Sequence, residues 1–217
     1  MERIDQEEGA RRLDAFRQQR LQGDYIFEFE LEHKPRKART VRYDGIMWGS
    51  WNEQGAVTRF KIFPNDADRE ADGEGADALV ELLVQNGPQP SAWMRRDPAE
   101  PMQRVEGEAL FEPLLPELVY SVFDLQMPFI YWEDFIYEGP SLIGMSSVQS
   151  KFAVESFKKV QEQYIVKKIT LAEYPSKDRT TFDVEDASVG LKLDKELFEV
   201  PAEPTAKPAV PACCGGH

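Results

Sequence analysis

Histidine is the side chain that most often moves protons near neutral pH, and this 217-residue chain contains only two, His33 and His217. His33 falls in a predicted hairpin turn and His217 is the last residue, so we expect neither to be held rigidly enough for a Ser–His–Asp or Cys–His site. The sequence also contains no GxGxxG, Walker or HExxH motif. We therefore predict that the protein is not an enzyme and that it has no cofactor.

Carboxylates are abundant, with 39 Asp and Glu residues, and a paired-carboxylate hydrolase is the catalytic alternative that stays open. Most of these acids fall on alternating, water-facing positions or in the acidic loop at residues 64–77, and Asp and Glu are rarely buried. An EF-hand register that starts at Asp68 places Leu79 where a chelating Glu is required, and one that starts at Asp66 places Ala71 where Gly is required. We expect a solvated loop without calcium.

The C-terminal tail offers the other set of metal-ligand side chains. Cys213, Cys214 and His217 supply two thiols and an imidazole, which soft metals such as Cu(I) and Zn(II) prefer. A closed structural zinc site needs four ligands, and the tail has three. We predict no metal site, and metal handling by these three residues stays as an alternative.

A dense aromatic stretch, LVYSVFDLQMPFIYWEDFIYEG at residues 118–139, is the most unusual part of the sequence. It contains no nucleophile–base pair, no phosphate loop and no metal-ligand spacing, and Pro128 argues against a regular central strand. Aromatic side chains of this kind form either a filled core or the wall of an apolar pocket. Of these two interpretations, the pocket wall is the one that would give the stretch a binding function.

The elements that would position this stretch are mostly strands. An amphipathic helix is expected over residues 5–22, with an apolar stripe that includes Leu13 and Phe16. The period then changes to two in Tyr25–Glu32, which is typical of a half-buried strand, and Gly45 and Gly49 in the next strand would allow bends or bulges. The other predicted strands are residues 38–50, 57–63, 78–85, 92–96, 102–105, 109–111, 151–159, 164–173 and 179–186.

These elements predict a mainly β (α+β) protein with one domain at residues 1–199. A single helix cannot cover both faces of so many strands, so we expect a curved antiparallel sheet, or incomplete β-barrel, with helix 5–22 as a lid. Strands at residues 24–111 and 151–186 would flank the aromatic segment at 118–139. Residues 200–217 are rich in Pro, Ala and Gly and are predicted to form a disordered tail.

Charge and composition exclude several classes of partner. The net charge is 26 − 39 = −13, which disfavours nucleic acid and anionic lipid surfaces. No window is apolar enough for a transmembrane segment, and two adjacent cysteines predict no disulfide framework. The first residues are charged from Glu2 onward, so we expect a cytoplasmic protein, or a periplasmic or outer-membrane peripheral one if a signal peptide was removed.

The order of motifs resembles a known family. The segments VYSVFDLQMPFIYWEDFIYEGP, KFAVESFKKVQEQYIVKKITLAEY, RTTFDVEDASVGLKL and LDKELF follow the helix and strands in the order of the outer-membrane lipoprotein-sorting proteins, the LolA/LolB-like group. The likeness covers most of residues 8–199 and is greatest with an uncharacterised, aromatic-rich bacterial branch. It implies an incomplete antiparallel barrel with an apolar cavity that carries or receives lipoprotein acyl chains. The stretch between Gly139 and Phe152 is shorter than in that branch, by about two strands at five to six residues each.

The predicted function is therefore a non-catalytic carrier or receptor for lipid or lipoprotein acyl chains, with a protein hand-off partner. The alternative is an interaction or structural module of the same fold, with a filled core, no ligand and an acidic surface. Leu13 and Phe16 would belong to the lid. The residues predicted to line the cavity are Phe27, Phe29, Met47, Trp48, Phe60, Trp93, Phe123, Phe129, Trp132 and Phe135.

Overall fold

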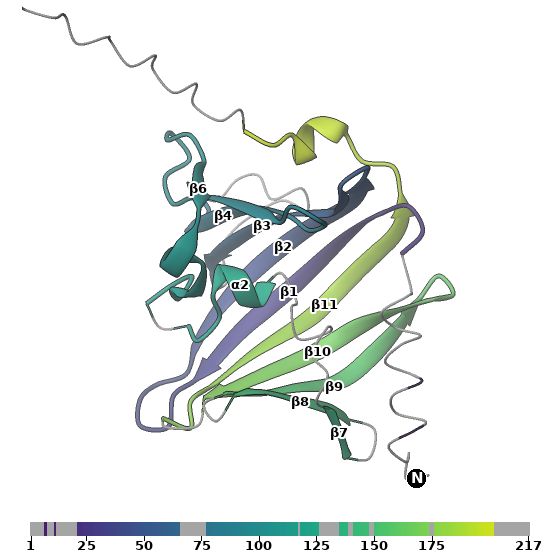
Figure 1. The fold of residues 1–217 in the computed structure, drawn as a ribbon. Helices are drawn as coiled ribbons and strands as arrows, with labels where there is room; N and C mark the ends of the chain where they lie inside the picture. The colour runs from purple at the N-terminus through teal and green to yellow at the C-terminus, as the bar shows by residue number, and fades with distance from the viewer. Residues whose placement is uncertain are drawn as a thin grey trace, which may run out of the picture.

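The alternating strands predicted from the sequence form one eleven-stranded antiparallel sheet (Figure 1). The structure, a computed structural model, describes residues 7, 11, 21–65, 77–116, 118–125, 135–138, 141–147, 150–173 and 176–201. The strands are β1 (Asp24–Lys34), β2 (Val41–Asn52), β3 (Gly55–Pro64), β4 (Val80–Gln85), β5 (Ser91–Arg95), β6 (Gln103–Val105), β7 (Phe135–Glu138), β8 (Ser141–Ser147), β9 (Ser150–Val160), β10 (Gln163–Glu173) and β11 (Arg179–Leu191).

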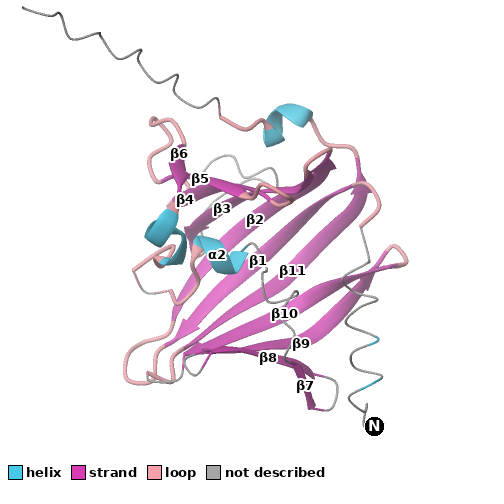
Figure 2. Cartoon of the chain, in the orientation of Figure 1, coloured by secondary structure: helices cyan, strands magenta, loops and turns pink. Residues whose placement is uncertain are grey.

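The strand order β6-β5-β4-β3-β2-β1-β11-β10-β9-β8-β7 describes two meanders joined side by side. β1 is the central seam, because it pairs with β2 on one side and with β11 on the other. β6 and β7 are the two free edges, so the sheet is not closed. The connection from β6 to β7 must return across the sheet, and it carries η1 (Gly107–Phe111) and α2 (Val122–Leu125), around which the sheet curves (Figure 2).

One face of the sheet, here called the inner face, carries most of the buried apolar side chains. The register aligns them in rows, because residues paired across neighbouring antiparallel strands project to the same side. In one row Phe27 pairs with Met47, Met47 with Phe60, and Phe60 with Leu82. All four side chains are buried and belong to one cluster. The two-residue period of β1 to β4 thus builds a continuous apolar surface.

Gly45 and Gly49 of β2 make room for aromatic rings on this surface. They were predicted to allow bends or bulges, but the pairing of β2 with β1 and β3 runs without a register shift. Instead, a Cβ at Gly45 would collide with the ring of Phe29, and one at Gly49 with the ring of Tyr25. The rings of two β1 residues therefore lie over glycine backbone in β2.

The opposite, outer face is more polar and is partly covered near the C-terminus. Glu81 is buried there, and its carboxylate accepts hydrogen bonds from Arg59 Nε at 2.6 Å and from Arg95 Nε at 2.7 Å. Burial would raise the pKa of Glu81, but the two guanidinium groups outweigh it and hold that pKa below its ordinary value. η3 (Lys195–Phe198) follows β11, and its Leu197 carbonyl accepts a hydrogen bond from Arg59.

Two regions of secondary structure differ from the sequence prediction. Residues 109–111, predicted as a strand, belong to the 3-10 helix η1, because the chain turns away from the sheet edge at Gly107, where φ is 61°. β7 and β8 form a hairpin, with Phe135 paired to Gly144, at residues where no strand was predicted. Pairing with β9, rather than any alternation of its own, gives β8 its place in the sheet.

Several predictions fall outside the described residues. Of the predicted helix at 5–22, only Glu7 and Arg11, which are helical, and Leu21 and Gln22, which are not, are described. The predicted tail at 200–217 is described only for its first two residues. In the part of the chain that the structure covers, no helix is long and apolar enough to span a membrane.

Candidate functional site

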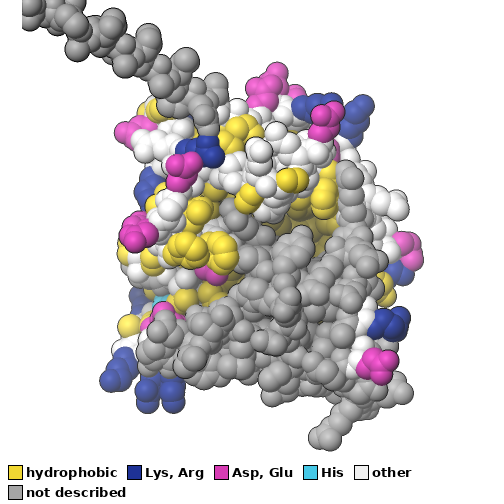
Figure 3. Space-filling view, viewed as in Figure 1, with side chains coloured by type: hydrophobic (Ala, Val, Ile, Leu, Met, Phe, Trp, Pro, Cys, Tyr) yellow, Lys and Arg dark blue, Asp and Glu magenta, His cyan; other side chains and the backbone are white. Residues whose placement is uncertain are grey.

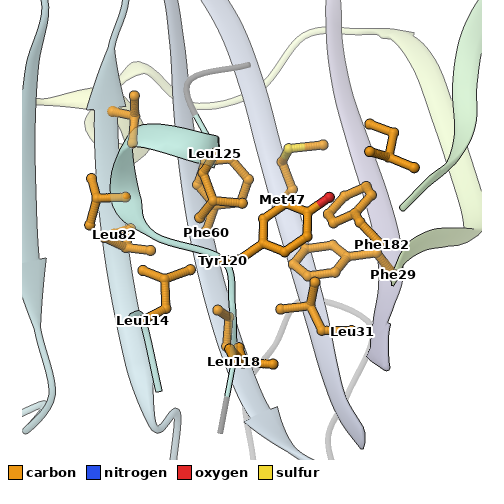
Figure 4. Packing of buried hydrophobic residues seen from close by; sticks show 14 of the residues in the cluster. Phe29, Leu31, Met47, Phe60, Leu82, Leu114, Leu118, Tyr120, Leu125 and Phe182 are labelled. Carbon is orange, nitrogen blue, oxygen red and sulfur yellow. The ribbon is translucent and has the colours of Figure 1, made fainter. Parts of the chain in front are cut away.

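The chain between β6 and β7 covers part of the inner face. Residues 112–116 and 118–125, here called the covering segment, pack apolar side chains onto the sheet (Figure 4). Leu114, Leu118 and Leu125 are buried in the same cluster as Phe60 and Leu82. This part of the inner face, on β3 to β5, is therefore filled by protein, and we call it the covered half.

Hydrogen bonds hold the covering segment in place at three points. The Leu114 amide donates to the Tyr120 carbonyl at 2.9 Å, which closes a loop within the segment. Arg96 Nη1 donates to the Leu114 carbonyl at 2.8 Å, and the Val119 amide donates to Thr180 Oγ1 at 3.2 Å. These bonds connect the segment to the chain after β5 and to β11, so its position on the sheet is fixed.

The other part of the inner face contains a pocket of about 160 Å³. We call this part, on β1, β10, β11 and the adjacent side of β2, the open half. The pocket is almost entirely apolar, and its floor comes from alternate residues of these strands. Floor residues include Phe27, Met47, Ile165, Ile169, Phe182 and Val184.

The pocket reaches the surface at the end of the sheet where β1 begins. Tyr25, Trp51 and Tyr164 line it there, and Tyr164 is 54% exposed. On the face seen in Figure 1, hydrophobic side chains gather over the sheet (Figure 3). Phe29 separates the two halves, since its ring stacks on Phe182 with centroids 4.5 Å apart and meets Phe60 edge-on at 6.5 Å.

Polar groups are few on the inner face. Burial raises the pKa of Asp124, although hydrogen bonds from the Ser121 side chain and amide, 2.7 and 2.8 Å long, oppose the shift. The hydroxyl of Tyr120 is buried and finds no hydrogen-bond partner among the described residues. Tyr25, at the mouth, has its pKa raised by burial, and its hydroxyl lies 3.5 Å from Thr58 Oγ1.

His33 is not in a turn, as the sequence suggested, but in β1. It is buried, and its Nδ1 lies 2.9 Å from Thr180 Oγ1, the same oxygen that accepts the Val119 amide. Both side chains are closed off from solvent, so the pair supports the covering segment and offers no nucleophile to a substrate. Among the residues that the structure describes, no group of three His, Cys, Asp or Glu side chains could hold a metal ion.

A second hollow lies at the opposite end of the sheet, between the β1–β2 and β10–β11 loops. Its volume is about 400 Å³, and it is lined by Arg36, Lys37, Ser176 and Asp178 among others. The Arg36 amide donates to Asp178 Oδ1 at 2.8 Å, which joins the two loops. This charged hollow does not suit an acyl chain, because burying charged groups against hydrocarbon is costly.

The predicted cavity residues are distributed over several places. Phe27 and Met47 line the pocket, while Phe29 and Phe60 lie beneath or beside the covering segment. Trp48 and Trp93 project to the outer face, where Trp48 packs with Ile46 and Phe63, and Trp93 with Val57 and Leu83. Successive strand residues alternate between faces, so Met47 on the inner face places Trp48 on the outer one.

The remaining predicted residues come from the aromatic stretch, the lid and the tail. Phe123 is half-buried in α2, and its ring lies 4.9 Å from that of Phe111. Phe135 begins β7, and only its backbone is described. The positions that lie outside the described residues are Leu13, Phe16, Phe129, Trp132, Cys213, Cys214 and His217.

Sequence reasoning missed the pocket residues contributed by the C-terminal strands. Ile169, Phe182 and Val184 are buried on the inner face, and Ile165 joins them from the start of β10. The alternation of Phe182 and Val184 with acidic neighbours was a usable signal. Knowing that β11 pairs with β1 was also necessary, and local sequence does not contain that information.

No protein-family model and no curated protein sequence matches the chain. Solved structures match it over most of its length. A DUF1329 family protein from Desulfovibrio piger aligns with a TM-score of 0.65 and 12% identity, covering 88% of this chain and 94% of that one. A domain assigned to outer membrane lipoprotein sorting, from Vibrio parahaemolyticus, aligns with a TM-score of 0.63 and 10% identity, covering 87% of this chain and 94% of that one. A LolA superfamily protein from Nitrosomonas europaea aligns with a TM-score of 0.53 and 11% identity, covering 82% of this chain and 91% of that one.

These alignments confirm the predicted fold. The chain has the architecture of the LolA-like proteins, an antiparallel sheet that is bent into an incomplete barrel and left unclosed. At this level of identity the likeness concerns the fold, and the function has to be argued from the site itself.

Proposed function

We propose that this protein is a non-catalytic carrier or receptor that binds an acyl chain of a lipid or lipoprotein in the pocket of the open half. The observation that carries the proposal is an apolar pocket that reaches the surface beside the exposed ring of Tyr164. The shared fold with lipoprotein-sorting proteins supports the same role. The corresponding location is the periplasm or the periphery of the outer membrane, where a carrier passes its cargo to a protein partner.

The size of the pocket sets how much of a chain it holds. A cavity of about 150 Å³ in another protein admits benzene, so about 160 Å³ accommodates roughly six carbon atoms. Six buried methylenes contribute about 5 kcal/mol, which is close to the 4 kcal/mol or more that association costs. A chain of 14–16 carbons would contribute about 11–13 kcal/mol in full burial. Tight binding therefore requires the pocket to widen or the chain to continue along the aromatic mouth.

The alternative is a ligand-free interaction module with the same fold. The covered half favours it, because there the inner face is filled by Leu114, Leu118 and Leu125. In this alternative the small pocket is a packing defect, and the function lies on the acidic surface. The two functions differ in a single observable, the presence of a bound hydrocarbon chain.

Native mass spectrometry of protein purified without detergent, followed by titration with palmitate, separates them. The carrier is expected to retain a lipid mass or to take up one palmitate. Val166→Trp, which places a large ring in the pocket, should weaken palmitate binding at least about tenfold, or 1.4 kcal/mol. Val41→Trp, the same change at a half-buried position at the far end of the sheet, is the matched control and should bind normally. A wild-type protein that is bare and takes up no palmitate would establish the module instead.

A further inference from the structure

The Tyr120 hydroxyl is the one buried side-chain polar atom, within the described part of the chain, that forms no hydrogen bond. The side chain is 3% exposed. Leaving a buried hydroxyl unpaired costs free energy, and folded proteins satisfy nearly all such groups. Phenylalanine at this position would pack the same ring without that cost. A tyrosine here therefore needs a reason beyond packing.

The backbone around Tyr120 fixes where its hydroxyl points. The Tyr120 carbonyl accepts the Leu114 amide, and the preceding amide, that of Val119, is bound to Thr180. In Figure 4 the ring crosses the inner face with its hydroxyl directed toward Met47 and Phe182. Both of these residues line the pocket. Tyr120 is not itself among the lining residues, so its hydroxyl lies behind this wall and is directed from the covered half toward the open half.

The hydroxyl is available as a donor at every physiological pH. Burial, with a smaller contribution from the negative charge of Asp124, raises the pKa of Tyr120 well above its ordinary value of 10.0. Asp124 does not accept this proton, since the Tyr120 hydroxyl has no hydrogen-bond partner among the described residues, and Asp124 Oδ2 instead accepts from the Ser121 amide and hydroxyl. A neutral O–H in apolar surroundings forms a strong bond with any oxygen that enters.

We propose that Tyr120 is the residue that recognises an oxygen atom of the ligand, so that the ligand is an acyl compound bearing an ester, amide or hydroxyl oxygen and not a plain hydrocarbon. The inference rests on the proposed function, since it assigns the ligand class of the same pocket. The hydrophobic wall supplies affinity for the chain. The Tyr120 hydroxyl supplies orientation and discrimination, as in ligand sites with few, well-placed polar groups.

Two probes of similar length, methyl decanoate and n-undecane, test this with the full-length protein. The wild type should bind the ester more tightly than the alkane. Tyr120→Phe should lose about 2- to 12-fold in ester affinity, the range for one hydrogen bond, and bind the alkane within twofold of the wild type. Tyr43→Phe removes the same atom from a buried tyrosine of β2 that is not among the residues lining the pocket, and it should leave the preference for the ester intact.

Two further readouts separate recognition from a structural role. The infrared band of a 13C-labelled ester carbonyl should move to lower frequency on binding to the wild type and should not move with Tyr120→Phe. Free Tyr120→Phe protein should melt no lower than the wild type, because the variant removes an unpaired polar group. Ester affinity unchanged in Tyr120→Phe, with both probes bound, would overturn this inference alone. Failure of both probes to bind the wild type would overturn the proposed function and the inference together.

Discussion

In both the covered and the open half of the inner face, apolar side chains project from the strands, but the two halves differ in what packs against them. Over Phe60 and Leu82 the covering segment fills the space, whereas beside Phe27 and Phe182 a pocket of about 160 Å³ is left. The sheet alone does not decide which half is hollow. Among the described residues, the covering segment is tied at Arg96 and Thr180 and packs its apolar side chains over the covered half. An interaction module needs only the first arrangement, and a carrier needs the second.

The largest expected effect is the loss of unfolding free energy when one phenylalanine in each half is replaced by alanine. Phe60→Ala should lower the free energy of unfolding by about 3–5 kcal/mol, because it removes a ring that is packed on all sides. Phe27→Ala should cost only about 1–3 kcal/mol, since one side of that ring already borders the pocket and has fewer contacts to lose. Urea unfolding of both variants gives the values. Equal costs would show that the two halves are packed alike.

A smaller effect concerns Asp124, which lies in the covering segment and has no counterpart in the open half. Its pKa is raised in the folded protein, so the folded state binds this proton more tightly than the unfolded state does. Its contribution to stability is full below the ordinary pKa of 3.8 and is lost as pH rises through the raised value. Asp124→Asn should remove that loss and should change stability at neutral pH by no more than about 1 kcal/mol.

The corresponding measurement is thermal unfolding of wild type and Asp124→Asn from acidic to neutral pH. The difference between the two profiles should change in the window above pH 3.8 and be flat elsewhere. A flat difference over the whole range would contradict the raised pKa of this carboxyl.

The strands of the fold could be predicted because their evidence is local. Tyr25–Glu32 alternates in the sequence and forms most of β1 in the structure. β7 and β8 could not be predicted in this way. The sequence of β8, SLIGMSS, shows no apolar–polar alternation, and its pairing with β9 places it in the sheet. The register of distant strands also decided the site. Trp48 and Trp93 were expected beside Met47, yet alternation turns both to the outer face.

The net charge is a sum that conceals local runs of one sign. The chain carries a net charge of −13, but residues 34–42 contain five Lys and Arg side chains and no acid. The structure places the exposed Arg36 and Lys37 of this run in the loop at the far end of β1 from the pocket mouth. The total therefore says little about a particular surface, because folding decides which charges are neighbours.

The central claim, that an acyl chain enters the open half, can be tested most directly by quenching of tryptophan fluorescence with a brominated palmitate. Trp51 lines the pocket, whereas Trp48 packs on the outer face of the same strand. Two single-tryptophan variants, each with the other three tryptophans replaced by phenylalanine, make the comparison within one fold. Our account predicts saturable quenching of Trp51 and little quenching of Trp48, because bromine quenches only at contact. Equal quenching of the two, or none, would contradict it.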